Sequence, residues 1–523
     1  MISTMKKLSR RTVLATAATI MVAPKTSLGR GISRCYSDVL DVAIIGAGVS
    51  GCYSAWRLSA QMPECTIGVF ERNNRIGGRL WSVKPKGMTQ QVAELGGMRI
   101  ANNQIPLLNL TRILKLSLEP YPATEPNNLY YLRGIRTRAK DLVCSPNYGY
   151  RPLKEFEGKK SGELFKIVLQ ELTGSTNWTR GSFEVAKAGF KFQGKPLNNL
   201  PYEYVFHQIL GSEASRFFTE TAGYGRPNIN VIQFLEEGAL DLFVKEYKHV
   251  KGGYDLVPKG LAEQAKAQGA TFTLGRTLLN LHFDGDLTVL TFADEGGKTY
   301  EVRAKSVIST LPDTAYEKLD HNCALRNTNG IKMLRNNLLG VPATKVYVNF
   351  PKQWWRELDM TSGRSITDLP MRQVFYLNDP SGRGLTLSPY ASGDNAEGFW
   401  KPLLQPMNKH RMSGDTIAGK AIVDQLNVVH GIKVPTPSEL IYRTFDGGYT
   451  GRGWNMWAPS TDVASTIANA RQPFKDRRVY CCGQGTAEIQ GWVMDTIASA
   501  ESVMRKKFNL ARPAWWPESY PAN

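Results

Sequence analysis

The chain has 523 residues, of which 42% are hydrophobic and 10% aromatic, and its 65 Lys and Arg against 46 Asp and Glu give a formal net charge of +19. This composition excludes a disordered, collagen-like or small disulfide-framework protein, and the length predicts roughly two to four structural units with cores of their own. The seven cysteines are scattered and form no paired C-x-x-C arrangement, so we expect no metal site.

The first 34 residues are predicted to be a targeting segment. They contain seven basic residues and no acidic one, and a basic stretch over residues 1–11 is followed by an apolar run over residues 13–22. That run is too short to span a bilayer, which takes about 20 residues, and no later segment is long and apolar enough to do so. The stretch around Arg10 and Arg11 resembles a twin-arginine export signal, with an ordinary secretory signal as the alternative. We expect an exported protein, periplasmic or secreted.

A nucleotide-binding motif follows this segment. Residues 41–45 form an apolar run of strand length, followed by Gly46-x-Gly48-x-x-Gly51 and a helical pattern over residues 52–60. In a strand–turn–helix unit, such glycines allow the turn, the approach of the backbone to a pyrophosphate and close packing of the helix. A second predicted strand ends in Glu71, whose carboxylate can accept hydrogen bonds from ribose hydroxyls. The spacing predicts a Rossmann-like unit that binds an adenine dinucleotide.

Two further motifs identify the dinucleotide. Residues 71–79 contain a glycine pair and resemble the extended fingerprint of flavin-containing amine oxidases. Residues 478–493 resemble the closing motif of that family, a strand and glycine turn before a helix whose N-terminus meets the flavin. The cofactor residues that the resemblance implies are Gly46, Gly48, Gly51, Glu71, Gly78, Arg79, Met98, Leu278, Gly483, Gln484 and Trp492.

Two positions bear on how the flavin would be held. Relatives usually have an acidic residue where this chain has Gln484, but an amide oxygen can accept the same hydrogen bond from a ribityl hydroxyl. Relatives that bind flavin covalently have a cysteine where this chain has Gly453. The resemblance therefore implies FAD that is bound non-covalently.

The resemblance covers nearly the whole chain after the targeting segment and implies the amine oxidase fold, an α/β fold. In that fold, residues 35–102, 238–330 and 475–510 form a Rossmann-like FAD-binding domain. It is interleaved with a mixed-sheet and helical substrate domain, formed by residues 103–237 and 331–474, and residues 511–523 form a tail. We expect the apolar runs 276–283 and 287–292 to pair as a hairpin, and residues 107–247 to be largely helical.

Two residues are predicted to bind a substrate carboxylate. Residues 94–100 resemble the glycine-rich segment of the L-amino acid oxidases that presents an arginine to the carboxylate, which assigns this role to Arg99. A guanidinium offers two parallel donors that match a carboxylate. Residues 365–376 resemble the strand of the same enzymes that supplies a tyrosine hydroxyl, which assigns Tyr376. The alternatives are a solvated surface arginine and a tyrosine packed within the sheet. We expect Glu94 to hold the turn rather than act as an acid or base.

The reacting end of the site is predicted from three further residues. Lys345 stands in an apolar strand pattern, where a lysine is costly unless it has a function. The resemblance assigns it to holding a water beside flavin N5. Gly491 and Trp492 match positions that line the amino-group side, with core positions as the alternative.

The implied reaction is oxidation of L-amino acids to 2-oxo acids by hydride transfer to flavin N5, with O2 as acceptor and release of ammonia and hydrogen peroxide. The partners are a small amino acid and O2, not a nucleic acid. An amine or polyamine oxidase and a flavin amino acid monooxygenase are alternatives within the same fold. Removing the seven charges of the targeting segment leaves +12, which also allows a non-catalytic cationic binding protein. A homodimer is compatible with the sequence. The sequence leaves open which amino acid side chains the enzyme prefers in its substrate.

Overall fold

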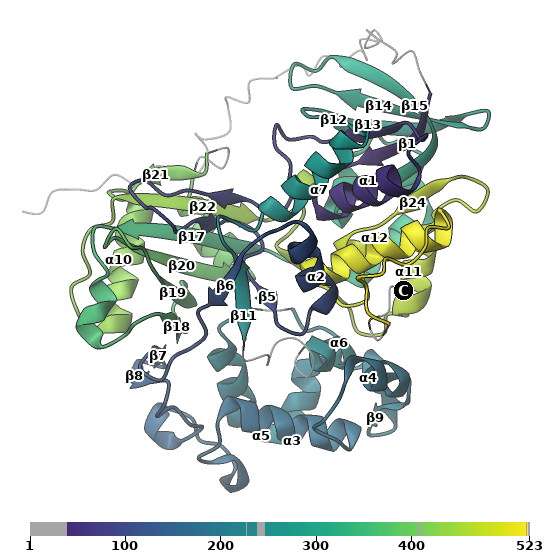
Figure 1. The fold of residues 1–523 in the computed structure, drawn as a ribbon. Coiled ribbons are helices and arrows are strands. Elements are labelled where there is room, and N and C mark those ends of the chain that lie inside the picture. Colours follow the sequence, from purple (N-terminus) through teal and green to yellow (C-terminus); the bar gives the residue numbers. More distant parts are fainter. Residues whose placement is uncertain (1–38, 226, 238–245, 406–408, 519, 521–523) are drawn as a thin grey trace, which may run out of the picture.

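The structure is a computed structural model that describes residues 39–225, 227–237, 246–405, 409–518 and 520, so the predicted targeting segment lies outside the described residues. The described chain forms two large sheets with their own helices and a separate helical group below them (Figure 1). The predicted α/β class, with a nucleotide-binding sheet and a second sheet, is confirmed. Within the described residues, we find no helix with both the length and the apolar character needed to cross a membrane.

The first sheet has the strand order β12-β2-β1-β15-β14-β13, and β24 pairs with β15. Its strands are β1 (Leu40–Ile45), β2 (Ile67–Phe70), β12 (Thr271–Thr273), β13 (Thr277–Asp284), β14 (Leu287–Ala293), β15 (Thr299–Ser309) and β24 (Val479–Cys481). β1 pairs in parallel with β2 and β15, whereas β13 and β14 pair antiparallel, which confirms the predicted hairpin. The strands of this sheet come from all three segments that the sequence assigns to FAD binding.

Three helices cover one face of this sheet (Figure 1). They are α1 (Val49–Gln61), α7 (Leu256–Ala267) and α12 (Val493–Lys507). A buried ion pair of 3.0 Å between Arg57 and Glu501 joins α1 to α12, and the Tyr53 hydroxyl donates to the same carboxylate. The end of the chain also belongs to this core, because Trp516 is buried against these helices.

The second sheet has the order β21-β22-β17-β20-β19-β18-β7-β8. Its strands are β7 (Leu129–Leu132), β8 (Ile135–Arg138), β17 (Ala343–Phe350), β18 (Gly363–Thr367), β19 (Gln373–Asn378), β20 (Gly384–Ser392), β21 (Arg411–Ser413) and β22 (Glu439–Phe445). Every residue of the central strand β17 is buried, since α10 (Ile417–His430) packs on one face and the junction with the first sheet lies on the other. Successive side chains of these strands therefore point into two different environments.

The segment over residues 107–247 is less helical than predicted. It contains α3 (Ser161–Thr173), α4 (Arg180–Ala186), α5 (Tyr202–Ala222) and α6 (Val231–Glu236), but also β6 (Leu118–Tyr121), β7, β8 and β11 (Tyr247–Val250). β7 pairs in parallel with β18, which lies more than 200 residues later in the chain. This pairing leaves no local pattern in the sequence, whereas β7 and β8 form a hairpin through Arg133 and Gly134, a local turn that the sequence analysis missed.

Shorter elements complete the fold. Those near the junction are α2 (Ile105–Ile113), α8 (Asn329–Asn337), α11 (Val463–Arg471), β3 (Ser82–Val83), β4 (Ala93–Glu94), β5 (Ile100–Ala101), β16 (Leu338–Val341) and β23 (Trp454–Trp457). The remainder are α9 (Lys401–Leu403), β9 (Lys191–Phe192) and β10 (Lys195–Pro196).

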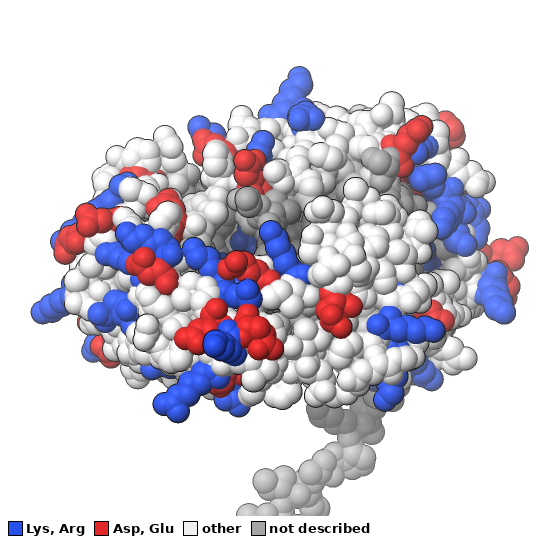
Figure 2. All heavy atoms as spheres, turned by 90° about the horizontal axis from the view of Figure 1, so that it is seen from below, with Lys and Arg blue, Asp and Glu red and all other residues white. Residues whose placement is uncertain are grey.

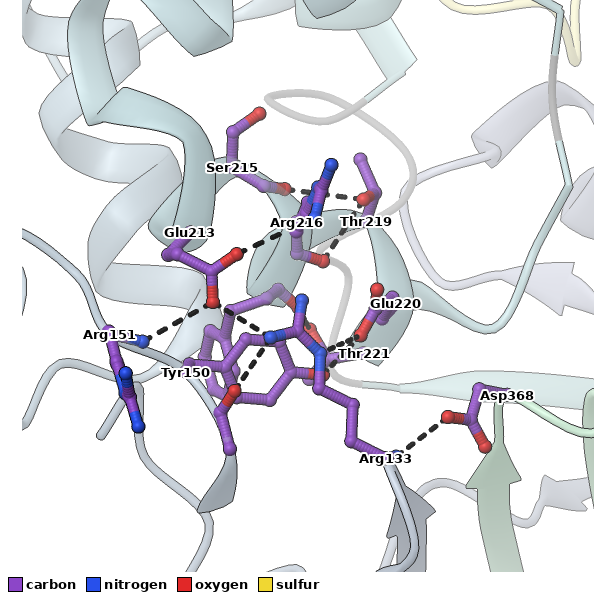
Figure 3. A network of polar contacts seen from close by, with 12 residues as sticks. Arg133, Tyr150, Arg151, Glu213, Ser215, Arg216, Thr219, Glu220, Thr221 and Asp368 are labelled. Carbon is purple, nitrogen blue, oxygen red and sulfur yellow. Dashed lines mark hydrogen bonds and ion pairs between the residues drawn. The ribbon is translucent and has the colours of Figure 1, made fainter. Parts of the chain in front are cut away.

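A polar network fastens the helical group to the second sheet (Figure 3). Arg133, in the turn between β7 and β8, forms ion pairs of 2.7 Å with Glu213 and 3.3 Å with Glu220, both on α5. Its guanidinium also lies 4.0 Å from the centre of the Tyr150 ring, and its backbone N–H donates to Asp368. The network joins α5 to the turn between β7 and β8.

The net positive charge does not form one continuous basic patch on the face shown in Figure 2. On that face, Lys and Arg side chains alternate with Asp and Glu side chains. Polyanion binding requires clustered basic residues, so this face gives no support to a cationic binding surface.

Candidate active site

A cavity of about 250 Å³ lies where the two predicted flavin motifs meet. The N-terminal ends of α1 and α12 both border it, so their free N–H groups and dipoles favour an anionic ligand. The predicted cofactor residues that line it are Gly46, Gly48, Glu71, Gly78, Arg79, Leu278, Gly483, Gln484 and Trp492. Segments from both ends of the chain thus meet around one ligand-sized space, and we call it the first cavity.

Gly51 does not line the first cavity. A Cβ on Gly51 would lie 1.9 Å from the carbonyl oxygen of Gly46, so this glycine allows α1 to pack against the preceding turn. Gly46 adopts a φ of +100° and a Cβ there would lie 2.5 Å from Thr310 Oγ1. The glycine pattern is therefore required by the shape of the turn, as its spacing predicted.

Glu71 lines the first cavity at the end of β2 and is 6% exposed. One carboxylate oxygen accepts a hydrogen bond of 2.8 Å from the Ala47 N–H, and the other accepts one of 2.8 Å from the Asn73 N–H. The carboxylate thus fixes the glycine turn while bordering the space predicted for the ribose. A carboxylate has further lone pairs with which to accept ribose hydroxyls.

Four arginines that the sequence analysis did not assign also line the first cavity. They are Arg72, Arg75, Arg276 and Arg443. The Nε atoms of Arg276 and Arg443 are buried and lack a hydrogen-bond partner among the described residues. Donors of this kind fit the anionic groups of a dinucleotide. Arg72 and Arg75 lie within the recognised motif, whereas no local pattern pointed to Arg276 or Arg443.

Gln484 has a defined partner in the first cavity. Its side-chain oxygen accepts a hydrogen bond from Arg79, which also donates to the Arg452 carbonyl at 3.3 Å. Burial lowers the pKa of Arg79. The amide of Gln484 therefore orients the guanidinium of Arg79. It does not supply the negative charge with which an acidic residue would compensate the arginine.

A second cavity of about 120 Å³ adjoins the first and shares several lining residues with it. Met98 and Arg99 line this second cavity, not the first. Arg99 Nη2 donates to the Tyr224 hydroxyl at 3.3 Å, and its guanidinium lies 4.3 Å from the centre of the Tyr247 ring. Among the described residues, no carboxylate forms an ion pair with it. Arg99 is thus inside the molecule, with its charge directed to the second cavity.

Lys345 lies between the two cavities and lines both. It is 5% exposed, and its Nζ donates to the carbonyl oxygens of Glu94 and Gly96 and lies 4.9 Å from the centre of the Tyr390 ring. Burial lowers the pKa of Lys345 to about 7. A buried amine that titrates near neutrality at a cavity wall is typical of a functional site.

Glu94 holds the turn, as predicted. Its carboxylate accepts hydrogen bonds of 2.7 Å from the Tyr254 N–H and from the Ser82 hydroxyl. Burial raises the pKa of Glu94 to about 7. The side chain thereby fixes the backbone whose carbonyl oxygen receives Lys345.

The assignment of Tyr376 to substrate binding is wrong. Its side chain is fully buried in the core beneath α10, where its hydroxyl contacts Ser365 at 2.7 Å and His430 Nε2 at 2.5 Å. It lines neither cavity. The neighbouring Phe375 points to the junction instead and packs against Tyr121. Because strand side chains alternate, one position in β19 decides which face a residue occupies.

The far wall of the site contains the predicted Gly491 and Trp492, which line both cavities. Trp454 lines both as well, whereas Trp457 is buried in a core and donates to the Glu488 carbonyl. The second cavity also includes residues that the sequence analysis did not assign, namely Tyr224, Glu237, Tyr254, Tyr390 and Gln490.

Comparison with known proteins identifies this arrangement. Residues 49–503 match the family described as flavin containing amine oxidoreductase. The chain is 24% identical to Aplysianin-A of Aplysia kurodai, over 90% of each chain. It is 23% identical to an L-amino-acid oxidase of Bothrops pauloensis, over 90% of this chain and 89% of the relative.

Two solved structures share the fold. A putrescine oxidase bound to putrescine aligns with a TM-score of 0.67 and 17% identity, over 91% of this chain and all of that one. A cyclohexylamine oxidase from Brevibacterium oxydans aligns with a TM-score of 0.66 and 18% identity, over 89% and 97% of the two chains. With the family match covering most of the sequence and a cavity whose glycine turns and arginines fit a flavin dinucleotide, the chain belongs to the flavin-containing amine oxidoreductases.

Proposed function

We propose that this flavoenzyme oxidises L-amino acids to 2-oxo acids, using FAD and O2 and releasing ammonia and hydrogen peroxide. The observation that carries the proposal is the guanidinium of Arg99, which is inside the molecule and directed to the cavity next to the predicted flavin space. An amine has no group for a buried guanidinium to bind, whereas an amino acid brings a carboxylate. The curated L-amino-acid oxidase relatives agree with this choice.

Each residue of the site has a role that follows from its position. Arg99 binds the carboxylate, and the Tyr224 hydroxyl and the Tyr247 ring hold the guanidinium in place. Gly491 and Trp492 border the side on which the amino group would lie. FAD held by the residues of the first cavity would supply the hydride acceptor for oxidation at the α-carbon. The protein contributes orientation, exclusion of water and a nearby cation at Lys345, whose two backbone acceptors fix its ammonium group.

We also propose that the FAD is held non-covalently. The described part of the chain contains six free cysteines, and none of them lines either cavity. A Cβ at Gly453 would lie 2.5 Å from Ala343 Cβ, which opposes a cysteine there. Release of the flavin on acid precipitation of the purified enzyme would support the proposal, and flavin that stays with the pellet would contradict it.

A peroxide assay tests the reaction. The purified holoenzyme is given the L-amino acids and, in parallel, their decarboxylated amines, and peroxide, ammonia and 2-oxo acid are measured together. We expect the three products in equal amounts from amino acids and none from amines. Turnover of amines alone would contradict the role of Arg99 and favour an amine or polyamine oxidase. An amide product without peroxide would indicate a monooxygenase.

Export through a twin-arginine route remains our proposal for residues 1–34, which lie outside the described residues. Its basis is the arginine pair ahead of a short apolar run. Replacing Arg10 and Arg11 by lysine should retain the enzyme in the cytoplasmic fraction of a host with this pathway. Unchanged export of the variant would favour an ordinary secretory signal.

A further inference from the structure

Three of the arginines that line the first cavity come from both sheets. Arg72 and Arg75 belong to the motif that follows β2, whereas Arg443 belongs to β22 of the second sheet. Arg443 lies directly opposite Lys345 where β22 pairs with β17, so both side chains are on the face of the second sheet that lines the first cavity. The second sheet thus contributes a guanidinium to the cavity whose glycine turns come from the first sheet.

The three guanidiniums lie near one another. The Arg75 guanidinium is 4.3 Å from the centre of the Trp81 ring, and the Arg443 guanidinium is 5.8 Å from the same ring. Arg72 lies 5.2 Å from the centre of the ring of Tyr449, which lines the same cavity. Burial lowers the pKa of Arg443, and the charge of Arg72 lowers it further. Burial lowers the pKa of Arg75 to about 10, and the charge of Arg443 acts in the same direction. The three positive charges therefore repel one another.

The carboxylates near this cluster are engaged by other groups. Glu71 accepts hydrogen bonds from two backbone N–H groups of the glycine-containing motifs. Asp446 forms an ion pair of 2.7 Å with Lys401, and Asp255 forms one of 2.8 Å with Lys259. The protein thus compensates the three guanidiniums only in part.

Arg443 differs from the other two arginines in its contacts. Arg75 donates to the carbonyl oxygen of Gly78 at 2.7 Å, and Arg72 donates to the Asn73 side chain at 3.3 Å. Among the described residues, we find no hydrogen bond or ion pair from the Arg443 guanidinium, and its Nε atom is buried. Burying a donor without an acceptor is costly, as is placing like charges together, and a bound anion would relieve both costs.

A phosphate group complements this cluster. Guanidinium N–H groups match phosphate oxygens in pairs, and the excess positive charge would be neutralised by a doubly negative pyrophosphate. We propose that Arg72, Arg75 and Arg443 form a phosphate-binding site that joins the two sheets. The phosphate comes either from the pyrophosphate of FAD, which the glycine turns of the same cavity favour, or from free phosphate. The first source rests on the proposed non-covalent FAD, and neither source depends on the proposed substrate.

The first test follows release of FAD from the holoenzyme. Each protein is diluted into buffer without FAD, and the rise in flavin fluorescence gives the rate of release. We expect Arg443→Met to release FAD roughly 10- to 100-fold faster than the wild type, because a charged hydrogen bond in a buried site is lost. Arg443→Lys should recover part of this loss, since the charge is kept. Arg72→Met should act in the same direction as Arg443→Met. Arg356→Met removes an exposed arginine after β17 and should release FAD at the wild-type rate.

The second test identifies the source of the phosphate. The wild-type holoenzyme is titrated with inorganic phosphate by calorimetry, at an ionic strength held constant with chloride. If FAD supplies the phosphate, we expect no binding of inorganic phosphate to the holoenzyme, and inorganic pyrophosphate should weaken FAD binding at equilibrium. Phosphate binding by the wild type but not by Arg443→Met, with FAD release unchanged, would assign the site to free phosphate.

The outcomes that would overturn the inference are equally specific. One is release of FAD by Arg443→Met and Arg72→Met within about threefold of the wild-type rate, with phosphate binding absent or equal in wild type and variant. Another is faster release from Arg356→Met as well, since the effect would then not be confined to this cluster. If Arg443→Met does not fold, Arg72→Met and the wild type decide. Unchanged FAD release by Arg72→Met, with no effect of phosphate or pyrophosphate on the wild type, would overturn the inference.

A failure of the proposed function is distinguishable from a failure of this inference. Oxidation of amines alone would overturn the proposed substrate and leave the phosphate site standing, because FAD release is measured without turnover. Acid precipitation reports covalent attachment of the flavin independently of Arg443.

Discussion

The two cavities of this protein are built in different ways, although they share a wall. The first is lined mainly by short runs of neighbouring residues, such as 48–50, 70–73 and 77–80. The second combines two such runs, 96–99 and 490–493, with single residues from distant elements, among them Tyr224 after α5, Glu237 after α6, Lys345 in β17 and Tyr390 in β20. The first cavity thus depends mainly on local turns, whereas the second depends also on how distant elements meet.

For the same reason, we expect substitutions in the first and in the second cavity to have different effects. A glycine turn is constrained by its own backbone, as the 1.9 Å approach at Gly51 illustrates. A side chain in the second cavity is constrained by partners elsewhere, as the contact of Arg99 with Tyr224 illustrates. We therefore expect variants in the second cavity to change substrate kinetics and leave flavin content intact. The predictions that follow test this separation.

The largest effect is expected at Arg99. Arg99→Met should lower kcat/KM for the preferred amino acid by about 10²- to 10³-fold, because it removes one partner of a buried charge pair with the substrate. Arg99→Lys should recover part of this loss, since a lysine supplies charge but not two parallel donors. Steady-state kinetics at a fixed flavin content provide the measurement. Arg112→Met, on the exposed side of α2, serves as the control.

If Arg99→Met instead loses its flavin, the expectation that substitutions in the second cavity leave flavin content intact is wrong. If its kinetics match those of the wild type, the carboxylate binds elsewhere.

Lys345 lies on the shared wall, so its variant should affect the step that involves O2. Lys345→Met should slow reoxidation of the reduced enzyme by about 10²-fold, because a fixed positive charge is lost where negative charge develops. Burial lowers the pKa of Lys345 to about 7, so the ammonium is present below that pH and is lost as the pH rises through it. Wild-type reoxidation should therefore slow over that range, whereas the variant should show no such step.

Stopped-flow reoxidation at a series of pH values measures both effects. Lys352→Met, which removes an exposed lysine, is the matched control. A pH step of equal size in Lys345→Met would assign the titration to another group.

Substitution of Tyr376 tests the face of the second sheet that packs against α10, opposite the junction with the first sheet. Tyr376→Phe should lower the free energy of unfolding by about 1 kcal/mol, since the hydroxyl is hydrogen-bonded in the core, and should change kcat/KM less than twofold. Denaturant titration and steady-state kinetics on the same preparation provide the measurement. A large kinetic effect with unchanged stability would restore the predicted substrate role.

His430 lies at the same face of the second sheet and should make the free energy of unfolding depend on pH. Burial lowers the pKa of His430 from 6.5 to about 4, so the unfolded chain takes up a proton at a higher pH than the folded chain does. Stability that depends on neutral His430 is therefore present above about pH 6.5 and is lost as the pH falls towards 4. Unfolding titrations at several pH values should show this loss of stability. Flavin binding at the first sheet should stay unchanged until the protein unfolds.

The smallest effect is expected at Gln484 in the first cavity. Gln484→Glu would offer a ribityl hydroxyl of the flavin a charged acceptor in place of a neutral one, so flavin binding should tighten by only about three- to tenfold, the usual gain of a charge-assisted over a neutral hydrogen bond. Titration of the apoprotein by flavin fluorescence measures the change. Weaker binding by the variant would show that the added charge opposes an anionic part of the flavin.

The sequence by itself determined the nucleotide-binding unit, the closing motif and Lys345. Each of these depends on a local rule: glycines that permit a turn and close packing, a carboxylate at the end of a strand, or a lysine that is costly in an apolar strand. Such rules act within a few residues, so they can be recognised in a single chain. Arg99 was found through the same kind of local resemblance.

Only the tertiary structure decided the composition of the second cavity beyond Met98, Arg99, Lys345, Gly491 and Trp492. It excluded Tyr376, because alternation along β19 turns that residue into the core, and it added Glu237, Tyr224 and Gln490. These positions follow from sheet register and from the way the helical group is held on the second sheet, which bring together residues that are far apart in the chain. Contacts of this kind have no local pattern, because their energy comes from partners that the neighbouring sequence does not contain.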